Sequence, residues 1–381
     1  MKIGIDARFY GSVGKGLGRY VQKLIENLEK IDKENQYFIF LLEENFDEFQ
    51  PKNKNFKKVL ANYRWYTFSE QIGMPKILNR YDLDVVHFPH FNVPIFYRKK
   101  FIITIHDLIL LKFPTLKGTR LNPIFYWIKF LAYRIIIGNA IKRSKKIITV
   151  SKFSKKDILK NYSFLKKEKV VVTYEACDLN KQKEILDAED KIKKYGIIKP
   201  YLLYVGNAYP HKNLDRMMLS WKIFIDEIKG KKMVFEKMPH LVLVGKQDYF
   251  YDKLSEKINK NKIKNVILTG FVNDDELGSI YHEAHSYIFP SLYEGFGLPP
   301  LEAMEKGVPV ISSNHGCMRE ILGRSAYYFE GRDKVSIVDA IKRIFFDFEL
   351  REKLISRGYK QILRYNWKKM AKETRLIYEE I

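Results

Sequence analysis

The residues best suited to chemistry are two glutamates that flank a glycine-rich turn. Glu294 and Glu302 lie in residues 290–304, which read PSLYEGFGLPPLEAM. The glycines let the backbone approach a ligand closely, and the prolines mark a helix start, whose N–H groups suit phosphate or sugar oxygens. Two carboxylates repel phosphate, so we expect them to accept hydrogen bonds from sugar hydroxyls. The alternative is a structural turn in which Glu302 caps the helix.

A second candidate follows the first apolar run in the second half of the chain. Residues 205–213 read VGNAYPHKN and open a helix. Lys212 there opposes the helix dipole, so a bound anion such as a diphosphate gives a reason for its position. The alternative is a solvated lysine in a first helical turn.

A third glycine-rich segment, GSVGKGLGRY over 11–20, follows the first apolar run of the chain. It fits a loop that faces phosphate or sugar. It also resembles a dinucleotide fingerprint, but Arg19 stands where the final glycine is needed. A nicotinamide-dependent or sugar-nucleotide oxidoreductase is therefore an alternative function.

Histidines and aspartates mark further positions. His106 comes just after an apolar run, which is typical of a site, although a structural histidine bonded to Asp107 or to backbone is the alternative. His87 and His90 are too isolated to propose a metal site. Asp82 and Asp84 precede their strand, so we interpret them as a solvated strand start.

The elements that must position these residues alternate between strands and helices. Continuous apolar runs predict strands buried on both faces of parallel sheets, and ligands bind beyond the carboxyl ends of such strands. The predicted strands are 2–6, 37–42, 58–61, 85–88, 101–105, 146–150, 170–174, 201–205, 241–244, 266–269, 287–289, 308–312 and 326–329, and helices are predicted at 17–31, 334–346, 349–363 and 367–381.

The pattern predicts an α/β chain of two doubly wound halves. The amino-terminal domain is expected over 1–180 and the carboxyl-terminal domain over 181–364, with a polar linker at 178–199. Two cysteines and no signal peptide suit the cytoplasm. The most apolar stretch, 121–141, contains charged residues and is a poor transmembrane span.

The charge is the unusual feature of the composition. The 381 residues carry a net charge of +23, and residues 1–178 hold 33 Lys or Arg against 17 Asp or Glu. Such a field attracts nucleic acid, nucleotides or an anionic membrane, with a lysine-rich coding bias as the alternative. A nucleic-acid binder is a further alternative, but no recognisable module interleaves basic and aromatic residues. Aromatic and basic residues in 121–143 suit a membrane interface, unless this is a buried crossover helix.

Taken together, these motifs make the chain resemble the retaining, nucleotide-sugar-dependent glycosyltransferases of family 4, and the resemblance covers essentially the whole chain. The resemblance lies in Glu294 and Glu302 with seven residues between them, in the Gly206 to Asn213 loop and in Ile105-His106-Asp107. It implies a GT-B fold, in which two doubly wound parallel-sheet domains face each other across a cleft and the last helix, 365–381, crosses back to the first domain. The forms of the motifs look most like mannosyl- and rhamnosyl-type transferases of surface-polysaccharide assembly.

The resemblance also implies the reaction and its residues. A hexosyl unit would pass from a nucleotide-diphosphate sugar, with GDP-mannose as first choice, to a glycan or lipid-linked glycan. It implies no metal and no cofactor. We expect no nucleic-acid partner, and the charge of residues 1–178 favours a cytoplasmic location that is peripheral on the inner membrane face. The implied catalytic residues are His106, Lys212 and Glu294, and the implied donor-binding residues are Gly16, Gly18, Gly206, Asn207, His211, Lys212, Gly270, Phe271, Val272, Glu294, Gly295, Phe296, Gly297, Leu298 and Glu302.

One departure from the family pattern concerns the phosphate loop. Many members carry an arginine directly after its glycine, where this chain has Asn207. Either His211 or Arg19 could supply the second phosphate contact.

Overall fold

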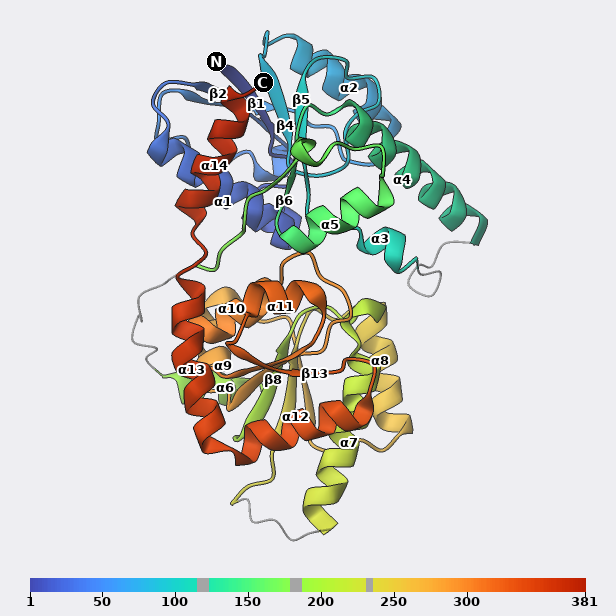
Figure 1. Cartoon of the computed structure of the whole chain (residues 1–381), viewed down its shortest axis with the longest axis vertical. Coiled ribbons are helices and arrows are strands. Elements are labelled where there is room, and N and C mark those ends of the chain that lie inside the picture. The colour runs from blue at the N-terminus through green and yellow to red at the C-terminus, as the bar shows by residue number, and fades with distance from the viewer. Residues whose placement is uncertain (115–122, 179–186, 231–235) are drawn as a thin grey trace. The chain divides into compact units, whose positions relative to one another are not determined.

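The computed structural model describes residues 1–114, 123–178, 187–230 and 236–381, which form two compact units (Figure 1). Unit 1 comprises Met1–Leu108, Arg120–Glu175 and Asn366–Ile381, and unit 2 comprises Ile109–Thr119 and Ala176–Tyr365. The boundary expected at 180/181 falls among residues 179–186, outside the described residues. Each unit is built on one parallel sheet, which confirms the predicted α/β class.

The sheet of unit 1 has seven parallel strands in the order β3-β2-β1-β4-β5-β6-β7. Its central strands are buried on both faces because they are continuously apolar; β5, for example, is buried at every residue. The strand order reverses between β1 and β4, which makes this the switch point of the sheet. The strands are β1 Lys2–Asp6, β2 Gln36–Leu41, β3 Phe56–Leu60, β4 Val85–Phe88, β5 Phe101–Ile105, β6 Ile147–Thr149 and β7 Val170–Val172.

The helices of unit 1 flank this sheet, and the last of them returns from the far end of the chain. It is α14, which packs beside α1 (Figure 1). Arg375 of α14 lies 3.8 Å from Asp32, and the Tyr378 hydroxyl lies 2.7 Å from Nδ1 of His87 on β4. The helices are η1 Gly11–Gly14, α1 Lys15–Ile31, η2 Glu43–Asn45, α2 Phe68–Asn79, α4 Pro123–Arg143, α5 Lys152–Asn161, η4 Lys167–Lys169 and α14 Trp367–Glu379.

Unit 2 repeats this design with six parallel strands in the order β10-β9-β8-β11-β12-β13, and its switch point lies between β8 and β11. A hydrophobic core of unit 2 lies where α7 and α12 pack around the fully buried Trp221. The strands are β8 Tyr201–Val205, β9 His240–Val244, β10 Val266–Gly270, β11 Ser286–Phe289, β12 Val310–Ser313 and β13 Ala326–Phe329. The helices are α3 Ile109–Lys112, α6 Ala188–Lys194, η5 Pro210–Lys212, α7 Leu214–Gly230, α8 Tyr249–Lys260, α9 Asp274–His282, α10 Leu298–Glu305, α11 Gly316–Leu322, α12 Lys334–Phe346 and α13 Phe348–Ile362.

Two predicted segments differ from the structure. The glycine-rich segment after β1 is not one long loop, because η1 spans Gly11–Gly14 and α1 begins at Lys15. The linker predicted over 178–199 contains α6. Only Ala188 and Ile192 of this helix are buried, and two apolar residues among lysines are too weak a pattern to predict a helix.

Candidate functional site

The loops after β8 and β11 are tied together over the switch point of unit 2. The backbone N–H of Leu292 donates to the carbonyl of His211 at 2.7 Å. The Asn213 amide donates to the carbonyls of Pro290 at 3.2 Å and Gly331 at 2.6 Å, which also brings in the loop after β13. Asn213 has a φ of 61°, a left-handed conformation that Asn tolerates better than most residues. Sequence reasoning placed Asn213 in the loop motif but gave it no role of its own, although an Asn before a helix is a turn signal.

Lys212 and Glu294 meet across these two loops. The Lys212 ammonium lies 2.6 Å from Oε1 of Glu294, and both side chains are largely buried. The ammonium also lies 5.6 Å from the centre of the Phe289 ring at the end of β11. The structure therefore brings two of the predicted catalytic residues together. In such a pair the cation can bind a diphosphate, and the carboxylate beside it can accept a hydrogen bond from a sugar hydroxyl.

His211 lies in the same loop but is buried, with ring centres 6.1 Å from Tyr209 and 6.0 Å from Phe113. Burial, together with the charge of Lys212, lowers the pKa of His211 to about 4, while Glu294 opposes this shift. His211 is therefore neutral at pH 7. A neutral imidazole can still donate one N–H to a phosphate oxygen, but it does not bring the second positive charge that the missing loop arginine would provide.

Gly206 and Asn207 form a loop whose backbone carbonyls accept hydrogen bonds from two tyrosines. The Tyr251 hydroxyl donates to the Gly206 carbonyl at 2.7 Å, and the Tyr204 hydroxyl donates to the Asn207 carbonyl at 2.7 Å. Gly206 has a φ of 149°, which favours glycine. At Gly245, after the neighbouring strand β9, a Cβ would lie 2.2 Å from the Gly206 carbonyl oxygen, so the two loops touch backbone to backbone.

The turn after β11 leads from Glu294 through Gly295 and Phe296 into α10. Gly297 precedes α10 with a φ of 91°, and a Cβ there would lie 2.7 Å from the Met318 side chain. Leu298 is the first residue of α10, and Glu302 lies one turn further on. Oε2 of Glu302 accepts a hydrogen bond from the Tyr281 hydroxyl at 3.2 Å. Both glutamates thus belong to the strand-to-helix connection that the sequence singles out.

Gly270 ends β10, and Phe271 and Val272 follow it at the same sheet edge. The N–H of Gly245 donates to the Gly270 carbonyl at 3.1 Å, and Gly270 has a φ of 74°. Phe271 is 74% exposed, whereas Val272 is buried. An exposed ring next to backbone groups suits a planar ligand such as a nucleobase.

His106 follows β5 in unit 1 and is paired with a carboxylate. Its Nδ1 lies 3.0 Å from Oε1 of Glu175, and its Nε2 lies 3.1 Å from the Pro89 carbonyl. Burial opposes the charged form, but the hydrogen bond and charge of Glu175 prevail and raise the pKa of His106. Sequence reasoning missed Glu175, although it lies just beyond the carboxyl end of β7.

Gly16 and Gly18 lie in the first turn of α1, after β1 of unit 1. A Cβ at Gly18 would lie 2.1 Å from the Gly11 carbonyl, so packing alone requires this glycine. Gly16 is exposed, and a Cβ there meets nothing within 4 Å. Gly16 is therefore the one of the two that a ligand can approach.

Other titratable residues have structural partners. His87 is fully buried between the Tyr378 and Thr104 hydroxyls, and burial lowers its pKa to about 3. Asp84 accepts from the backbone of Lys2 at the amino end of β4, as expected of a strand start. Across the described ranges, no three His, Cys, Asp or Glu residues come together as metal ligands.

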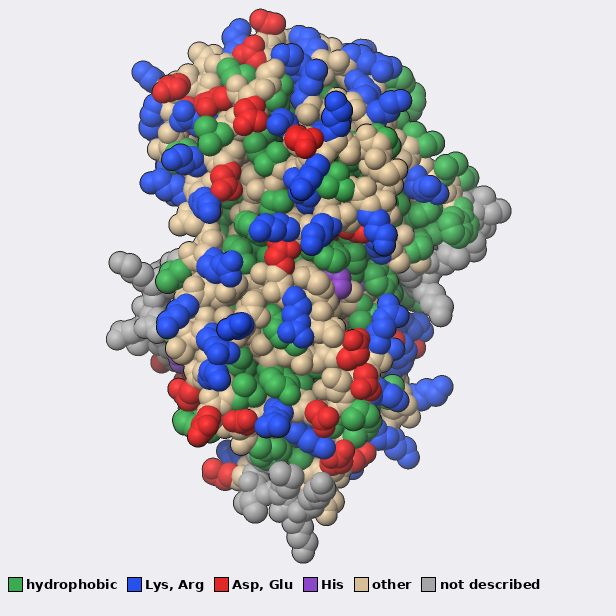
Figure 2. All heavy atoms as spheres, viewed as in Figure 1, with side chains coloured by type: hydrophobic (Ala, Val, Ile, Leu, Met, Phe, Trp, Pro, Cys, Tyr) green, Lys and Arg blue, Asp and Glu red, His purple; other side chains and the backbone are tan. Residues whose placement is uncertain are grey.

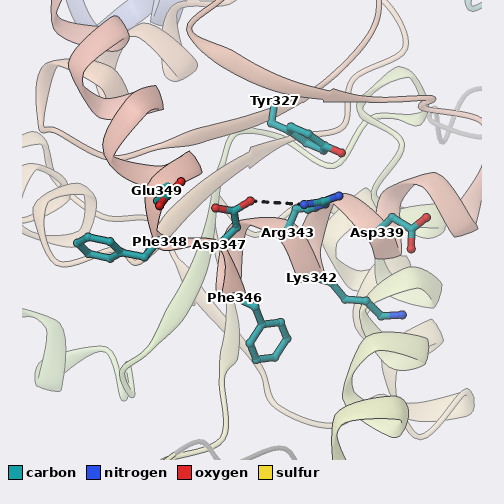
Figure 3. Close-up of a pocket in the computed structure, with 8 residues that line it drawn as sticks. All are labelled: Tyr327, Asp339, Lys342, Arg343, Phe346, Asp347, Phe348 and Glu349. Atoms are coloured by element: carbon teal, nitrogen blue, oxygen red, sulfur yellow. Dashed lines mark hydrogen bonds and ion pairs between the residues drawn. The ribbon is translucent and has the colours of Figure 1, made fainter.

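A hollow of about 710 Å³ in unit 2 does not belong to this site (Figure 3). It is lined by Tyr327 on β13 and by the junction between α12 and α13, where Arg343 pairs with Asp347. Tyr327 is the second residue of β13, so the hollow lies toward the amino ends of the strands. Ligands of doubly wound sheets bind at the opposite edge.

Each half of the chain matches the model of a protein family. Residues 187–361 match the model of glycosyl transferases group 1, and residues 14–181 match the model of Glycosyltransferase Family 4. The chain is a family 4 glycosyltransferase. Over 309 residues this glycosyltransferase is 28% identical to the O-antigen chain mannosyltransferase RfbU of Salmonella typhimurium, covering 80% of this chain and 76% of that one. Over 379 residues it is 25% identical to the Escherichia coli O-antigen chain mannosyltransferase B, covering 94% of each.

Solved structures show the same fold. Sucrose-phosphate synthase from Thermosynechococcus elongatus superposes with a TM-score of 0.75 at 16% identity, covering 100% of this chain and 98% of that chain. Anabaena HepE in complex with UDP and glucose gives a TM-score of 0.73 at 12% identity, covering 100% of each. The predicted GT-B fold of this glycosyltransferase is confirmed. Neither the oxidoreductase nor the nucleic-acid binder gains support from these comparisons.

Proposed function

We propose that this glycosyltransferase transfers mannose, with retention of anomeric configuration, from GDP-mannose to a glycan or lipid-linked glycan. The observation that carries the proposal is the Lys212–Glu294 pair at the switch point of unit 2, beside a glycine-rich turn into a helix. The choice of mannose is supported by two relatives that are named O-antigen chain mannosyltransferases. A nucleoside diphosphate as the leaving group is supported by HepE, which was solved with UDP and glucose.

Each donor group meets residues whose chemistry suits it. Lys212 stabilises the negative charge that develops on the departing diphosphate. The backbone N–H groups of residues 295–298, which lead into the prolines of α10, bind phosphate or sugar oxygens. Glu302 accepts hydrogen bonds from the ribose hydroxyls, and Glu294 accepts them from the donor sugar. We assign no protein nucleophile and no metal or cofactor to the reaction.

His106 is the proposed catalytic contribution of unit 1. With Nδ1 on Glu175 and Nε2 on the Pro89 carbonyl, its ring is fixed at the carboxyl edge of the sheet. To hydrogen-bond a hydroxyl of the transferred sugar near the reacting centre, Nε2 would exchange the Pro89 carbonyl for that hydroxyl while Nδ1 stays on Glu175. Gly16 leaves room for a ligand to approach the start of α1.

A lipid-linked acceptor is supported by the surface of α4. Trp127, Ile128, Leu131 and Ile135 are each more than half exposed and lie on one side of this helix, which extends away from the sheet in Figure 1. Lys142 lies on the same side near the end of α4. It lines a hollow of about 520 Å³ whose lining is mostly basic. Figure 2 shows many further Lys and Arg side chains on the face in view. Apolar and cationic groups together suit an anionic membrane surface.

This surface would bind a membrane from one side. Among the helices of the described part of the chain, none is long and apolar enough to cross a bilayer. Residues 121 and 122 of the predicted interfacial segment lie outside the described residues. We propose peripheral association on the cytoplasmic face.

The test is a thermal-shift panel of GDP, UDP, ADP and CDP, followed by a transfer assay. A ligand at a hundredfold excess over its Kd stabilises the folded chain by about 2.7 kcal/mol. We expect GDP to give the largest shift and GDP-mannose to support transfer to a mannose oligosaccharide with the configuration retained. A larger shift with another nucleotide would overturn the donor assignment, and an inverted product would overturn the stereochemistry.

A further inference from the structure

Aromatic rings from three loops gather over the switch point of the unit 1 sheet. Phe9 follows β1 and His90 follows β4, and their ring centres lie 5.2 Å apart. Trp65, from the segment after β3, stacks on Phe9 with centres 4.3 Å apart and planes 28° apart. Tyr66 lies 6.2 Å from His90 and 6.3 Å from Phe91. Aromatic rings thus cover part of the sheet edge at which ligands bind.

Tyr66 combines exposure with backbone strain. Its side chain is 57% exposed, and its φ of 65° is left-handed, a conformation that costs free energy for any residue with a Cβ. A tyrosine that only filled space in the hydrophobic core would need neither an exposed ring nor a left-handed backbone. Strain of this kind persists where the surroundings fix it, and it gathers at ligand sites.

A buried network holds Tyr66 in this conformation. The Tyr66 N–H donates to Oε2 of Glu70 at 2.8 Å, and Oε1 of the same carboxylate accepts from Arg8 at 2.6 Å and from Asn92 at 2.7 Å. Arg8 also forms two hydrogen bonds to Asp6 at the end of β1. Glu70 and Arg8 are completely buried, so the network is rigid and pre-organises the exposed ring.

The proposed catalytic histidine borders the aromatic cluster. Nε2 of His106 lies 3.1 Å from the carbonyl of Pro89, the residue before His90. The His106 ring also lies edge-on to Tyr20, with centres 4.7 Å apart. The loop that carries His90 and Phe91 thus contacts both the imidazole and the exposed Tyr66 ring.

We propose that Tyr66 and Trp65 form a platform for a hexopyranose ring of the acceptor glycan, which places the acceptor beside His106. The inference rests on the proposed function and adds the residues that select the acceptor. A pyranose has a face of C–H groups and a rim of hydroxyls. Its face packs on an aromatic ring, and its rim reaches the polar groups around the platform.

The test measures binding and transfer of a synthetic mannose trisaccharide. It compares the wild type with two variants of the protein at Tyr66. Tyr66→Gly removes the ring but tolerates the left-handed backbone, so loss of binding cannot be due to added strain. Tyr66→Phe keeps the ring. We expect Tyr66→Gly to raise the KM for the trisaccharide roughly tenfold while leaving the KM for the donor unchanged, and Tyr66→Phe to keep both values.

Saturation-transfer NMR gives a readout that needs neither donor nor turnover. The wild type and Tyr66→Phe should transfer saturation to the trisaccharide, and Tyr66→Gly should not. Phe96→Ala is the matched control, because Phe96 is an exposed ring of unit 1 that lies before β5, on the way to the amino edge of the sheet. It should bind the trisaccharide as the wild type does.

The possible outcomes separate this inference from the proposed function. An unchanged KM and NMR signal in Tyr66→Gly would overturn the platform, as would a wild type that gives no signal with the trisaccharide. If GDP-mannose is not used but the signal still depends on Tyr66, the donor assignment fails and the platform stands.

Discussion

The Lys212 ammonium and the Glu294 carboxylate, 82 residues apart in the chain, lie 2.6 Å from each other at the point where the strand order of unit 2 reverses. The pair holds a cation in place before any diphosphate arrives. A bound diphosphate would compete with Glu294 for the lysine. The carboxylate, once released, could turn toward sugar hydroxyls.

Replacing Lys212 should therefore affect turnover more than folding. We expect Lys212→Ala to lower kcat by roughly a hundredfold or more, since it removes a charge that acts on the leaving group. Lys257→Ala is the matched control, because Lys257 forms an exposed ion pair with Asp215 in the same unit. Steady-state kinetics with saturating GDP-mannose check the prediction, and equal rates for both variants would contradict it.

The pair formed by His106 and Glu175 should be visible as a pH effect. The folded-state pKa of His106 is raised, so its protonated form stabilises the fold fully below the unfolded pKa of about 6.5. This contribution is lost as the pH rises through the folded pKa. We expect an NMR titration midpoint above 6.5 for His106 and a lower one in Glu175→Gln.

His87 provides the internal control for that titration. It lies on the neighbouring strand, and burial holds its pKa at about 3, so its signals should stay constant from pH 5 to 9. An unchanged His106 midpoint in Glu175→Gln would show that the carboxylate does not control the imidazole.

Asn213 should prove important for stability through both its backbone and its amide. Asn213→Gly keeps the left-handed backbone but leaves two buried carbonyls without their donor, at a cost of about 1–3 kcal/mol. Asn213→Ala adds about 1 kcal/mol of backbone strain. Denaturant unfolding measures both values, and a more stable Ala variant than Gly variant would contradict the ordering.

Two glycines of unit 2 should respond oppositely to alanine. Gly297→Ala adds a Cβ 2.7 Å from Met318 at a φ of 91°, so we expect a loss of about 1–3 kcal/mol. At Gly278, inside α9, an added Cβ meets nothing within 4 Å. Gly278→Ala should stabilise by about 0.4–1 kcal/mol. The same unfolding experiment compares the two variants.

Membrane association should depend on the exposed side of α4. We expect the double variant Trp127→Ser, Ile128→Ser to lose sedimentation with anionic liposomes at low salt, where the wild type sediments. The matched control is Phe348→Ser, which removes an exposed ring from unit 2. Binding that survives in the double variant would place the membrane contact elsewhere.

Much of the fold follows from the sequence because its strands are buried on both faces. The bounds of β4, β5, β8 and β13 agree with their predicted runs, since continuous apolar stretches end where the backbone leaves the sheet. β7 ends at Val172, before the predicted 174, because β7 is an edge strand and pairs with β6 only over Val170–Val172. Apolar character alone does not show where pairing stops.

Sequence reasoning named candidate residues where one segment carries the signal, and it assigned no role to residues that act across distant segments. Lys212 and Glu294 stand in motifs whose glycines and prolines mark them. Asn213 acts through carbonyls 77 and 118 residues away, and Glu175 acts on a histidine 69 residues away. No local pattern contains such pairings, because they arise only when strands become neighbours in the sheet.

The return of α14 to unit 1 has a consequence for biosynthesis. Residues 1–175 leave the ribosome before residues 366–381, and until then the unit they form lacks the Tyr378 hydroxyl beside His87 and the Arg375 guanidinium beside Asp32. The domain that is made first is thus completed last. Its nascent form must wait, with an open flank beside α1, while almost all of unit 2 is translated, and this is the interval in which a chaperone would be needed most.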